Sequence, residues 1–219
     1  METLQPLHDV DPGDISDEDE IVLPWWRNPL NLIAILVATA ILAASSGFIV
    51  GERSATPRPN AVDVGFLQDM RTHHEQAVEM SLVFMSKPDT DAALRTIARE
   101  IVFGQGIDIG RMIQLLRDFG KPEANESGTA MTWMNESVPE ARMPGMASGS
   151  DQETLLQAEG TRADAVFAAL MIAHHHGGIH MADYAATNAA TAEVRQAAAD
   201  MSSGQVDEIK EIQGLQIVG

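Results

Sequence analysis

The chain repeats itself after about one hundred of its 219 residues. The segment DVGFLQDMRTHHEQAVEMS at 63–81 aligns with DAVFAALMIAHHHGGIHMA at 164–182 at a constant offset of 101. The matched positions include a phenylalanine, two methionines and a pair of histidines, which are all rare residue types in this chain. A second match, Gln-x-x-Asp-Ile at 105–109 with Gln-x-x-Glu-Ile at 205–209, follows at an offset of 100. These coincidences indicate a duplicated unit, so the fold must pack two similar halves together.

Each half has the residue spacing of two helices. Positions 63, 66, 70, 73, 77 and 80 are separated alternately by three and four residues, which is typical of a helix with one buried seam. The same spacing runs from 94 to 115 in the first half and from 194 to 215 in the second. Lys87-Pro88-Asp89 breaks the first hairpin, with Asp89 or Thr90 as the next N-cap, and Thr187-Asn188 breaks the second. The sequence therefore predicts an all-α fold, a four-helix bundle made of two αα-hairpins.

Composition agrees with helices and excludes several functions. Aromatic residues make up only 5% of the chain, which disfavours a β-sandwich. The net charge of −18 argues against a nucleic-acid partner, since basic side chains supply most of that affinity. The chain has no cysteine, which excludes disulfides, thiolate zinc sites, iron–sulfur clusters and a lipoprotein anchor.

A transmembrane helix is predicted before the bundle. Residues 30–50 carry no charge and are long enough to span a bilayer core, and Trp25 and Trp26 precede them as an interfacial anchor. A buried core helix is the alternative, but the stretch has no polar face. The eight acidic residues of the preceding segment favour an uncleaved signal anchor over cleavage near Ala43 or Ala44. The predicted order is an acidic flexible tail at 1–24, the signal anchor at 25–53, a linker at 54–60 and the bundle at 61–219, with repeat one at 61–119, a Met-rich connecting loop at 120–150 and repeat two at 151–217.

The polar residues in the apolar seams are the candidate site. His73 and His174 lie on the seams and are expected to point inward, while His74 and His175 flank them. Bundle interiors commonly build metal sites from such facing side chains. The candidate ligands are His73, His74, His174, His175, Met70, Met80, Met171 and Met181, with His176 and His180 in the second repeat and Met143 and Met146 in a Met-Pro-Gly-Met loop. Gln105, Asp108, Gln205 and Glu208 are candidates to hold these ligands or to replace them.

Imidazole and thioether together favour copper, and thioether favours Cu(I) in particular. Two other interpretations stay open at this point. The histidine pairs could only pack and hydrogen-bond across the bundle, as in an accessory subunit of a membrane complex. A di-iron or di-manganese oxidoreductase could use Asp108 and Glu208 with His73 and His174, although the Glu-x-x-His motif of such sites is missing. No hydrolase arrangement or phosphate loop stands out, so we expect a binding protein rather than an enzyme.

The paired pattern D-x2-F-x3-M-x2-HH-x2-[AG]-[VI]-x-M, followed by Q-x2-[DE]-I, resembles the bacterial domain-of-unknown-function family 305. The resemblance covers about residues 61–217 and includes the Met-Pro-Gly-Met loop. It implies a ferritin-like bundle, export from the cytoplasm, and a kinship with periplasmic copper-binding proteins. It also implies that the two histidine pairs and the surrounding methionines are the core motif. Two features depart from the family, namely Glu75-Gln76-Ala77 where a glycine is common and the acidic tail with its anchor.

The resemblance also decides the expected location. Arg27 precedes the span and three arginines follow it within about twenty residues, so loop charge alone would place the bundle in the cytoplasm. Similarity to exported proteins places it on the extracytoplasmic side instead. We therefore expect a membrane-anchored copper protein for buffering, resistance or delivery, with a membrane complex or a cuproenzyme as partner. Association into a homo-oligomer stays open.

Overall fold

The computed structural model describes residues 24–55 and 58–215, in two compact units, Met1–Ala55 and Thr56–Gly219. All but the last residue of the acidic tail predicted at 1–24, and two residues of the linker predicted at 54–60, lie outside the described residues.

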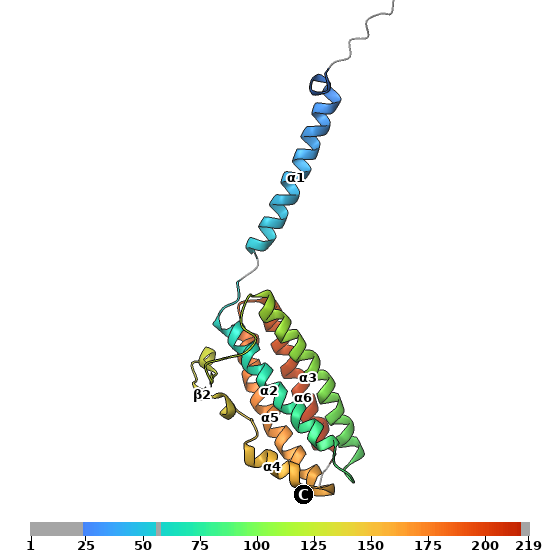
Figure 1. The fold of residues 1–219 in the computed structure, drawn as a ribbon, viewed down its shortest axis with the longest axis vertical. Helices are drawn as coiled ribbons and strands as arrows, with labels where there is room; N and C mark the ends of the chain where they lie inside the picture. The colour runs from blue at the N-terminus through green and yellow to red at the C-terminus, as the bar shows by residue number, and fades with distance from the viewer. Residues whose placement is uncertain (1–23, 56–57, 216–219) are drawn as a thin grey trace, which may run out of the picture. The chain divides into compact units, whose positions relative to one another are not determined.

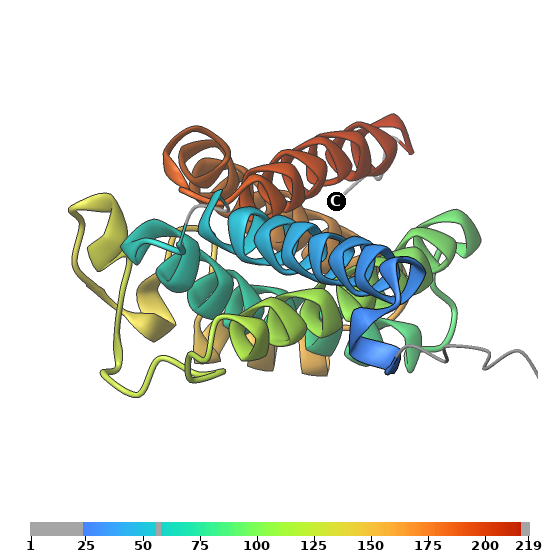
Figure 2. The ribbon, with the colours of Figure 1, turned by 90° about the horizontal axis from the view of Figure 1, so that it is seen from above.

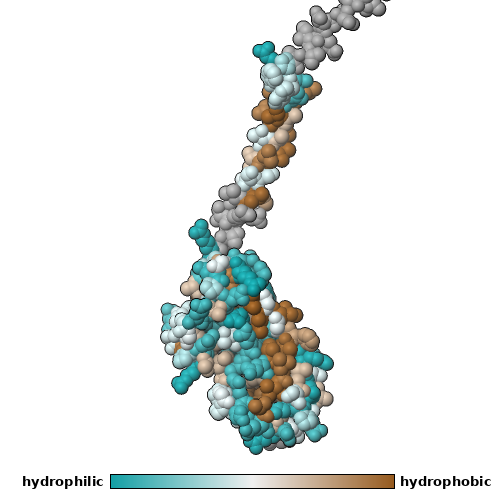
Figure 3. All heavy atoms as spheres, in the orientation of Figure 1, coloured by the Kyte–Doolittle hydropathy of each residue, from teal (hydrophilic) through white to brown (hydrophobic). Residues whose placement is uncertain are grey.

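The first unit contains a short 3₁₀ turn, η1 (Trp25–Arg27), and the helix α1 (Pro29–Ala55). Its stretch Pro29–Ile49 has a mean hydropathy of 2.4 and is long and apolar enough to cross a membrane. None of that stretch is buried within the residues that the structure describes. Figure 3 shows its exposed apolar side chains.

The second unit is a bundle of four long helices, α2 (Ala61–Met85), α3 (Ala92–Asp118), α5 (Gly160–Asn188) and α6 (Ala192–Gly214) (Figure 1). The hairpin α2–α3 comes from repeat one and the hairpin α5–α6 from repeat two, and they lie against each other when seen from above (Figure 2). The predicted all-α fold of two αα-hairpins after one apolar helix is therefore confirmed.

The hairpin turns begin and end slightly later than the sequence predicts. The N-cap of α3 is Asp91, whose side chain accepts a hydrogen bond from Leu94 N at 2.8 Å. Asp89 instead has a φ of 55° and forms the turn before it. Thr187 and Asn188 remain inside α5, and Thr191 is the N-cap of α6. The observed caps differ from the predicted ones because a contact with the other repeat fixes the position of each cap.

Two buried aspartates make those contacts. Asp63 accepts hydrogen bonds from the backbone N of Ala190 and Thr191, each at 2.9 Å, at the start of α6. Asp164, at the equivalent position of repeat two, accepts one from Asp91 N at 2.9 Å, at the start of α3. Each therefore ties the start of its own repeat to the turn of the other, beyond the simple helix-start role that its position predicts.

The connecting segment has more structure than an irregular loop. It forms a two-stranded antiparallel ladder, β1 (Thr129–Ala130) with β2 (Val138–Pro139), and the 3₁₀ turns η2 (Thr132–Met134) and η3 (Glu140–Arg142). A fifth helix of this unit, α4 (Gly149–Gln157), spans the predicted start of repeat two at residue 151. The sequence spacing predicts only two helices in that repeat. Ser148 and Asp151 form a capping box that starts this short helix.

The bundle interior consists of two apolar clusters, and each draws on both repeats. The Trp133 cluster contains Trp133 with Phe66, Met70, Met112, Met143, Met181 and Met201 among others. The Phe84 cluster contains Phe84 with Met80, Ile101, Phe167 and Met171 among others, and its two phenylalanines stack at 4.3 Å between ring centroids. Along α2 the chain passes from the first cluster to the second, and along α5 it passes from the second to the first. The two helices thus run antiparallel, with the histidine pairs between the clusters.

Candidate metal centre

Four histidines form a buried layer across the middle of the bundle. His73, His174 and His175 are 0% exposed and His74 is 1% exposed. Buried Gln105 and Gln205, each 4% exposed, come from α3 and α6 between residues of the same two apolar clusters. We call these six residues the histidine layer. Polar side chains buried this completely are rare unless they are hydrogen-bonded or bind an ion or another ligand.

The two repeats meet at this layer. The rings of His73 and His174 lie 3.7 Å apart between centroids, with their planes inclined by 32°. Because these two residues are equivalent in the repeat, their contact places the pseudo-two-fold axis between them. The two halves therefore share one layer rather than forming two separate pockets.

Three of the four rings have their Nε2 atom next to an oxygen. His73 Nε2 donates to the carbonyl oxygen of Pro144 at 3.1 Å. His175 Nε2 donates to Glu208 Oε2 at 2.5 Å, and His74 Nε2 lies 3.6 Å from Asp108 Oδ2. An oxygen acceptor at Nε2 holds the proton there and leaves Nδ1 as a free electron pair. Metal-binding histidines are commonly oriented in this way by a carboxylate or carbonyl on their second nitrogen.

The other nitrogens of the layer have no partner within the described part of the chain. These atoms are Nδ1 of His73, His74 and His175 and both ring nitrogens of His174. The amide groups of Gln105 and Gln205 are likewise unpartnered among those residues. A buried polar atom without a hydrogen bond is costly, at about 1–3 kcal/mol each, so such a concentration in one layer points to a bound species.

Burial keeps the central rings uncharged. Burial, and then the neighbouring His74, lowers the pKa of His73 to about 3. Burial, and then the neighbouring histidines led by His73, lowers the pKa of His174 well below its usual value near 6.5. Both rings are therefore neutral at physiological pH, which is the protonation state that binds metals.

The methionines lie on both sides of the histidine layer. Met70, Met181 and Met143 are all at most 2% exposed and belong to the Trp133 cluster. Met80 and Met171, both at most 1% exposed, belong to the Phe84 cluster on the other side. Met146 is partly buried against the Trp133 cluster. The predicted soft donors are thus buried around the histidines.

The Met-Pro-Gly-Met loop packs directly on α5 beside the layer. A Cβ atom on Gly177 would lie 1.8 Å from the Pro144 oxygen, and one on Gly145, whose φ is 80°, would lie 2.8 Å from His174 Cα. Only glycine permits this approach, which brings the Pro144 carbonyl to His73. Sequence reasoning missed Pro144 and Gly177 as site residues. The glycine pair that follows the histidines inside a helix was the available signal, because glycine there destabilises the helix.

In the first repeat, a glutamine side chain rather than a glycine contacts the connecting segment. Gln76 stands at the position equivalent to Gly177, and its amide donates to Ala147 O at 2.9 Å and accepts from Ala147 N at 2.7 Å. The departure from the family at Glu75-Gln76-Ala77 therefore gives α2 a side chain that holds the end of the connecting segment.

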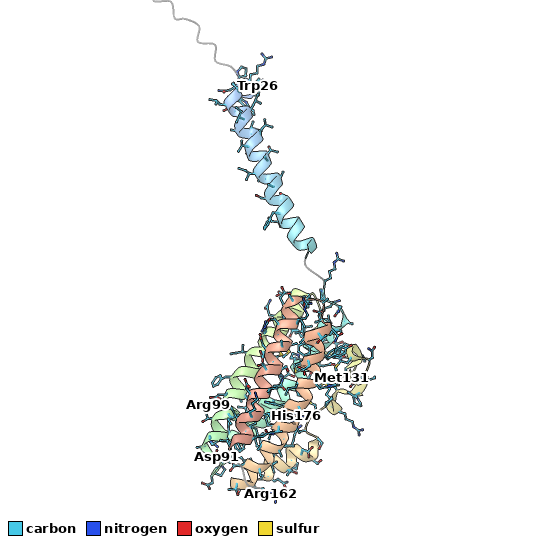
Figure 4. The ribbon with its side chains drawn as sticks, turned by 180° about the vertical axis from the view of Figure 1, so that it is seen from behind. Trp26, Asp91, Arg99, Met131, Arg162 and His176 are labelled. Carbon is cyan, nitrogen blue, oxygen red and sulfur yellow. The ribbon has the colours of Figure 1, made fainter. Side chains whose placement is uncertain are left out.

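Two of the six predicted histidine ligands lie outside the histidine layer. His176 on α5 is exposed (Figure 4). His180 is 52% exposed and lies 3.6 Å from Glu136. The structure thus brings four of the six candidate histidines of the bundle together and leaves these two on its surface.

Within residues 24–55 and 58–215, no three His, Cys, Asp or Glu side chains are grouped to hold a metal ion. Asp108 and Glu208 face His74 and His175, one each, rather than His73 and His174. This is not the arrangement of a di-iron carboxylate site, in which carboxylates from several helices converge. The donors that the layer offers are imidazole nitrogen, with methionine sulfur buried on either side.

Known proteins share this fold. Residues 63–216 match the family model described as Domain of unknown function (DUF305), while no curated protein matches the chain. A crystal structure described as a secreted DUF305 protein from Streptomyces coelicolor is 34% identical, covers 70% of this chain and 91% of its own, and has a TM-score of 0.65. A DUF305 fragment from Deinococcus radiodurans is 27% identical over 73% of this chain and 97% of its own, with a TM-score of 0.63. CopM in its Cu(I)-bound form is 25% identical over 70% of this chain and 94% of its own, with a TM-score of 0.52.

Proposed function

This chain belongs to the DUF305 family, and from that premise we propose that its histidine layer binds Cu(I), for copper buffering, resistance or delivery to a cuproenzyme. One observation carries the proposal. Two buried imidazoles, those of His73 and His175, donate a hydrogen bond from Nε2 to an oxygen, and His74 Nε2 lies 3.6 Å from a carboxylate oxygen. The Nδ1 atoms of all three rings have no partner among the described residues. That is how proteins commonly present histidine to a metal.

The donor set favours copper over iron or manganese. Neutral imidazole together with thioether is the combination that Cu(I) prefers, whereas iron and manganese sites are rich in carboxylates. Since no three His or acidic side chains converge among the described residues, we infer that one or more of Met70, Met143 and Met181 completes the coordination. The structural neighbour CopM binds Cu(I), which supports the same choice.

Copper affinity of the full-length chain in detergent tests this proposal, with a chromophoric Cu(I) chelator as competitor. Changing His73, His74, His174 and His175 to Gln is expected to weaken binding by at least about 100-fold. The matched control changes the exposed His176 and His180 to Gln and should bind as the wild type does. Circular dichroism of each variant separates lost binding from lost fold. A folded four-histidine variant with wild-type affinity would contradict the proposal.

A second set of variants separates ligation from packing. Changing Met70 and Met181 to Leu keeps the side-chain volume and removes the sulfur, so stability should change by less than about 1.5 kcal/mol each. If the sulfur binds copper, Cu(I) affinity should fall by about tenfold or more while the fold persists. Unchanged affinity would exclude Met70 and Met181 as ligands and leave Met143 as the remaining candidate of the three. Absence of any Cu(I) binding by the wild type would instead favour an accessory role in which the stacked His73 and His174 only pack.

We also propose that α1 anchors the bundle on the extracytoplasmic side of the membrane. The apolar stretch Pro29–Ile49 and the similarity to a secreted relative support this location. A C-terminal alkaline phosphatase fusion should be active and a C-terminal fluorescent protein fusion dark if the bundle is exported through the secretory pathway. The reverse result would place the bundle in the cytoplasm, as the arginines after the span alone would predict.

A further inference from the structure

A narrow cleft of about 150 Å³ lies between α3 and α6, and His74 lines it. Apart from Asp200 and Met201, its other residues come in equivalent pairs from the two repeats. Gly104 with Gly204, Gln105 with Gln205, and Asp108 with Glu208 all line the cleft. Because both members of each pair face one space, the pseudo-two-fold axis of the bundle passes through it.

Charge and polarity change along the cleft. Asp108 and Glu208 are 30% and 24% exposed, so they meet solvent, yet each also contacts a histidine of the buried layer. Gln105 and Gln205 are 4% exposed and their amide groups are unpartnered among the described residues. A Cβ atom on Gly178, one helical turn after His174, would lie 2.1 Å from Gln205 Oε1, so this amide reaches the face of α5 that carries His174. The cleft thus joins solvent-exposed carboxylates and buried amides to the imidazole of His74.

Two glycines, Gly104 of α3 and Gly204 of α6, are among the residues that line the cleft. A Cβ atom on Gly104 or on Gly204 would meet no atom within 4 Å, so no packing contact demands a glycine there. Glycine in an exposed helix interior makes the helix less stable than alanine would. An equivalent glycine in both repeats, with space around it, keeps the cleft open.

We propose that this cleft is the path by which Cu(I) reaches the histidine layer. The proposal rests on the copper function proposed above and deepens it by assigning the route. The carboxylates of Asp108 and Glu208 attract the cation at the mouth, since clefts lined by one sign of charge raise the local concentration of counter-ions. Gln105 and Gln205 line the same cleft as His74, so the cation would pass their amide groups on its way to the imidazoles.

Loading kinetics of the full-length chain in detergent test the path. Cu(I) is presented as its complex with a chromophoric chelator, and the colour change is followed by stopped flow. Changing Gly104 and Gly204 to Leu fills the cleft without touching a histidine, and should slow loading by about tenfold or more. The equilibrium affinity for Cu(I) should stay within about threefold, because the ligands are intact.

The matched control changes Gly106 and Gly110 to Leu. Both are exposed glycines of α3 with no atom within 4 Å of an added Cβ, and neither lines the cleft. This control should load at the wild-type rate. Equal loading rates in the cleft-filling and control variants would overturn the path while leaving the copper function intact. A wild type that binds no Cu(I) at equilibrium would overturn the function, and the path with it.

A charge variant provides a second, independent measurement. Changing Asp108 to Asn and Glu208 to Gln should slow loading by about tenfold at low salt and remove most of its salt dependence. The control changes two exposed carboxylates outside the cleft, Glu79 and Glu211, to Gln, so that its net charge equals that of the cleft variant. If both double variants slow loading equally, the overall charge of −18 attracts the cation and the cleft carboxylates have no special role.

Discussion

A buried histidine ring that donates a hydrogen bond from one nitrogen can bind a metal or a proton only through its other nitrogen. His73 donates through Nε2 to Pro144, and its surroundings keep the ring neutral. In this state it can bind a metal through Nδ1, but it cannot accept a proton without a large cost. The same features that suit the ring to copper therefore make the metal-free protein sensitive to acid.

The first prediction concerns that sensitivity. The native pKa of His73 is about 3 and that of His174 is also lowered, while both titrate near 6.5 in the unfolded chain. As pH falls below about 6.5, the unfolded state binds more protons than the native state, so stability is lost on acidification. The loss should be about 1.4 kcal/mol per pH unit for each histidine until its native pKa is reached. Urea unfolding of the metal-free chain at pH 7.5, 5.5 and 4.5 measures it.

The control for this prediction is the variant with His73 and His174 changed to Gln, whose stability should depend less on pH in that range. Asp63 does not interfere, since its hydrogen bonds from Thr191 and Asn60 overcome the effect of burial and hold its pKa below the usual 3.8. The contribution of Asp63 to the free energy of unfolding is lost only at a pH below the range of these measurements. Equal slopes for the wild type and the variant would show that both rings accept protons in the native bundle.

A single methyl group tests the packing of the Pro144 loop. Changing Gly177 to Ala places a Cβ atom 1.8 Å from the Pro144 oxygen, so the loop must move, at a cost of about 1–3 kcal/mol. Changing Gly104 to Ala adds the same group where no atom lies within 4 Å, and should stabilise the helix by about 0.5–1 kcal/mol. The midpoints of denaturant unfolding report both effects. A Gly177 variant as stable as the wild type would mean that the loop is not held against α5.

At the scale of elements, spacing predicts the helices, whereas distant contacts decide the segments between them. The three-four spacing gave the seams of α2, α3, α5 and α6, because a helix face is a local property of the sequence. The connecting segment could not be predicted in the same way. Its turns depend on Asp69, which accepts hydrogen bonds from Met131 N at 2.7 Å and from Trp133 Nε1 at 2.8 Å. Nothing local to 120–150 reveals that partner on α2.

The third prediction tests the role of Asp69. Changing Asp69 to Ala leaves the Met131 amide and the Trp133 indole without their acceptor, so the segment should loosen from α2. In a background with Trp25 and Trp26 changed to Phe, the fluorescence of Trp133 should shift to longer wavelength. Hydrogen exchange at residues 125–135 should quicken by about tenfold. Changing the exposed Asp183 to Ala should produce neither effect, and an unshifted spectrum in the Asp69 variant would contradict the prediction.

At the scale of the whole molecule, the duplication predicted two histidine clusters but left open whether they merge. The sequence alignment places His73 and His174 at equivalent positions, and it cannot tell how far apart the hairpins hold them. The structure joins them, with 3.7 Å between ring centroids. Each apolar cluster likewise takes residues from both repeats. The bundle therefore has one shared interior, and copper stoichiometry should reflect it.

The fourth prediction follows from this shared interior. One variant changes His73 and His74 to Gln, and the other changes His174 and His175 to Gln. If each repeat formed its own site, either variant would keep about half of the tightly bound Cu(I). Because the rings of His73 and His174 are in contact across the pseudo-two-fold, we expect each variant alone to lose nearly all tight binding. Titration to saturation, with protein concentration measured independently, gives the copper bound per chain. If both variants bound half as much copper per chain as the wild type, the two histidine pairs would bind copper independently despite their contact. The bundle would then contain two sites, each completed by the methionines of its own repeat.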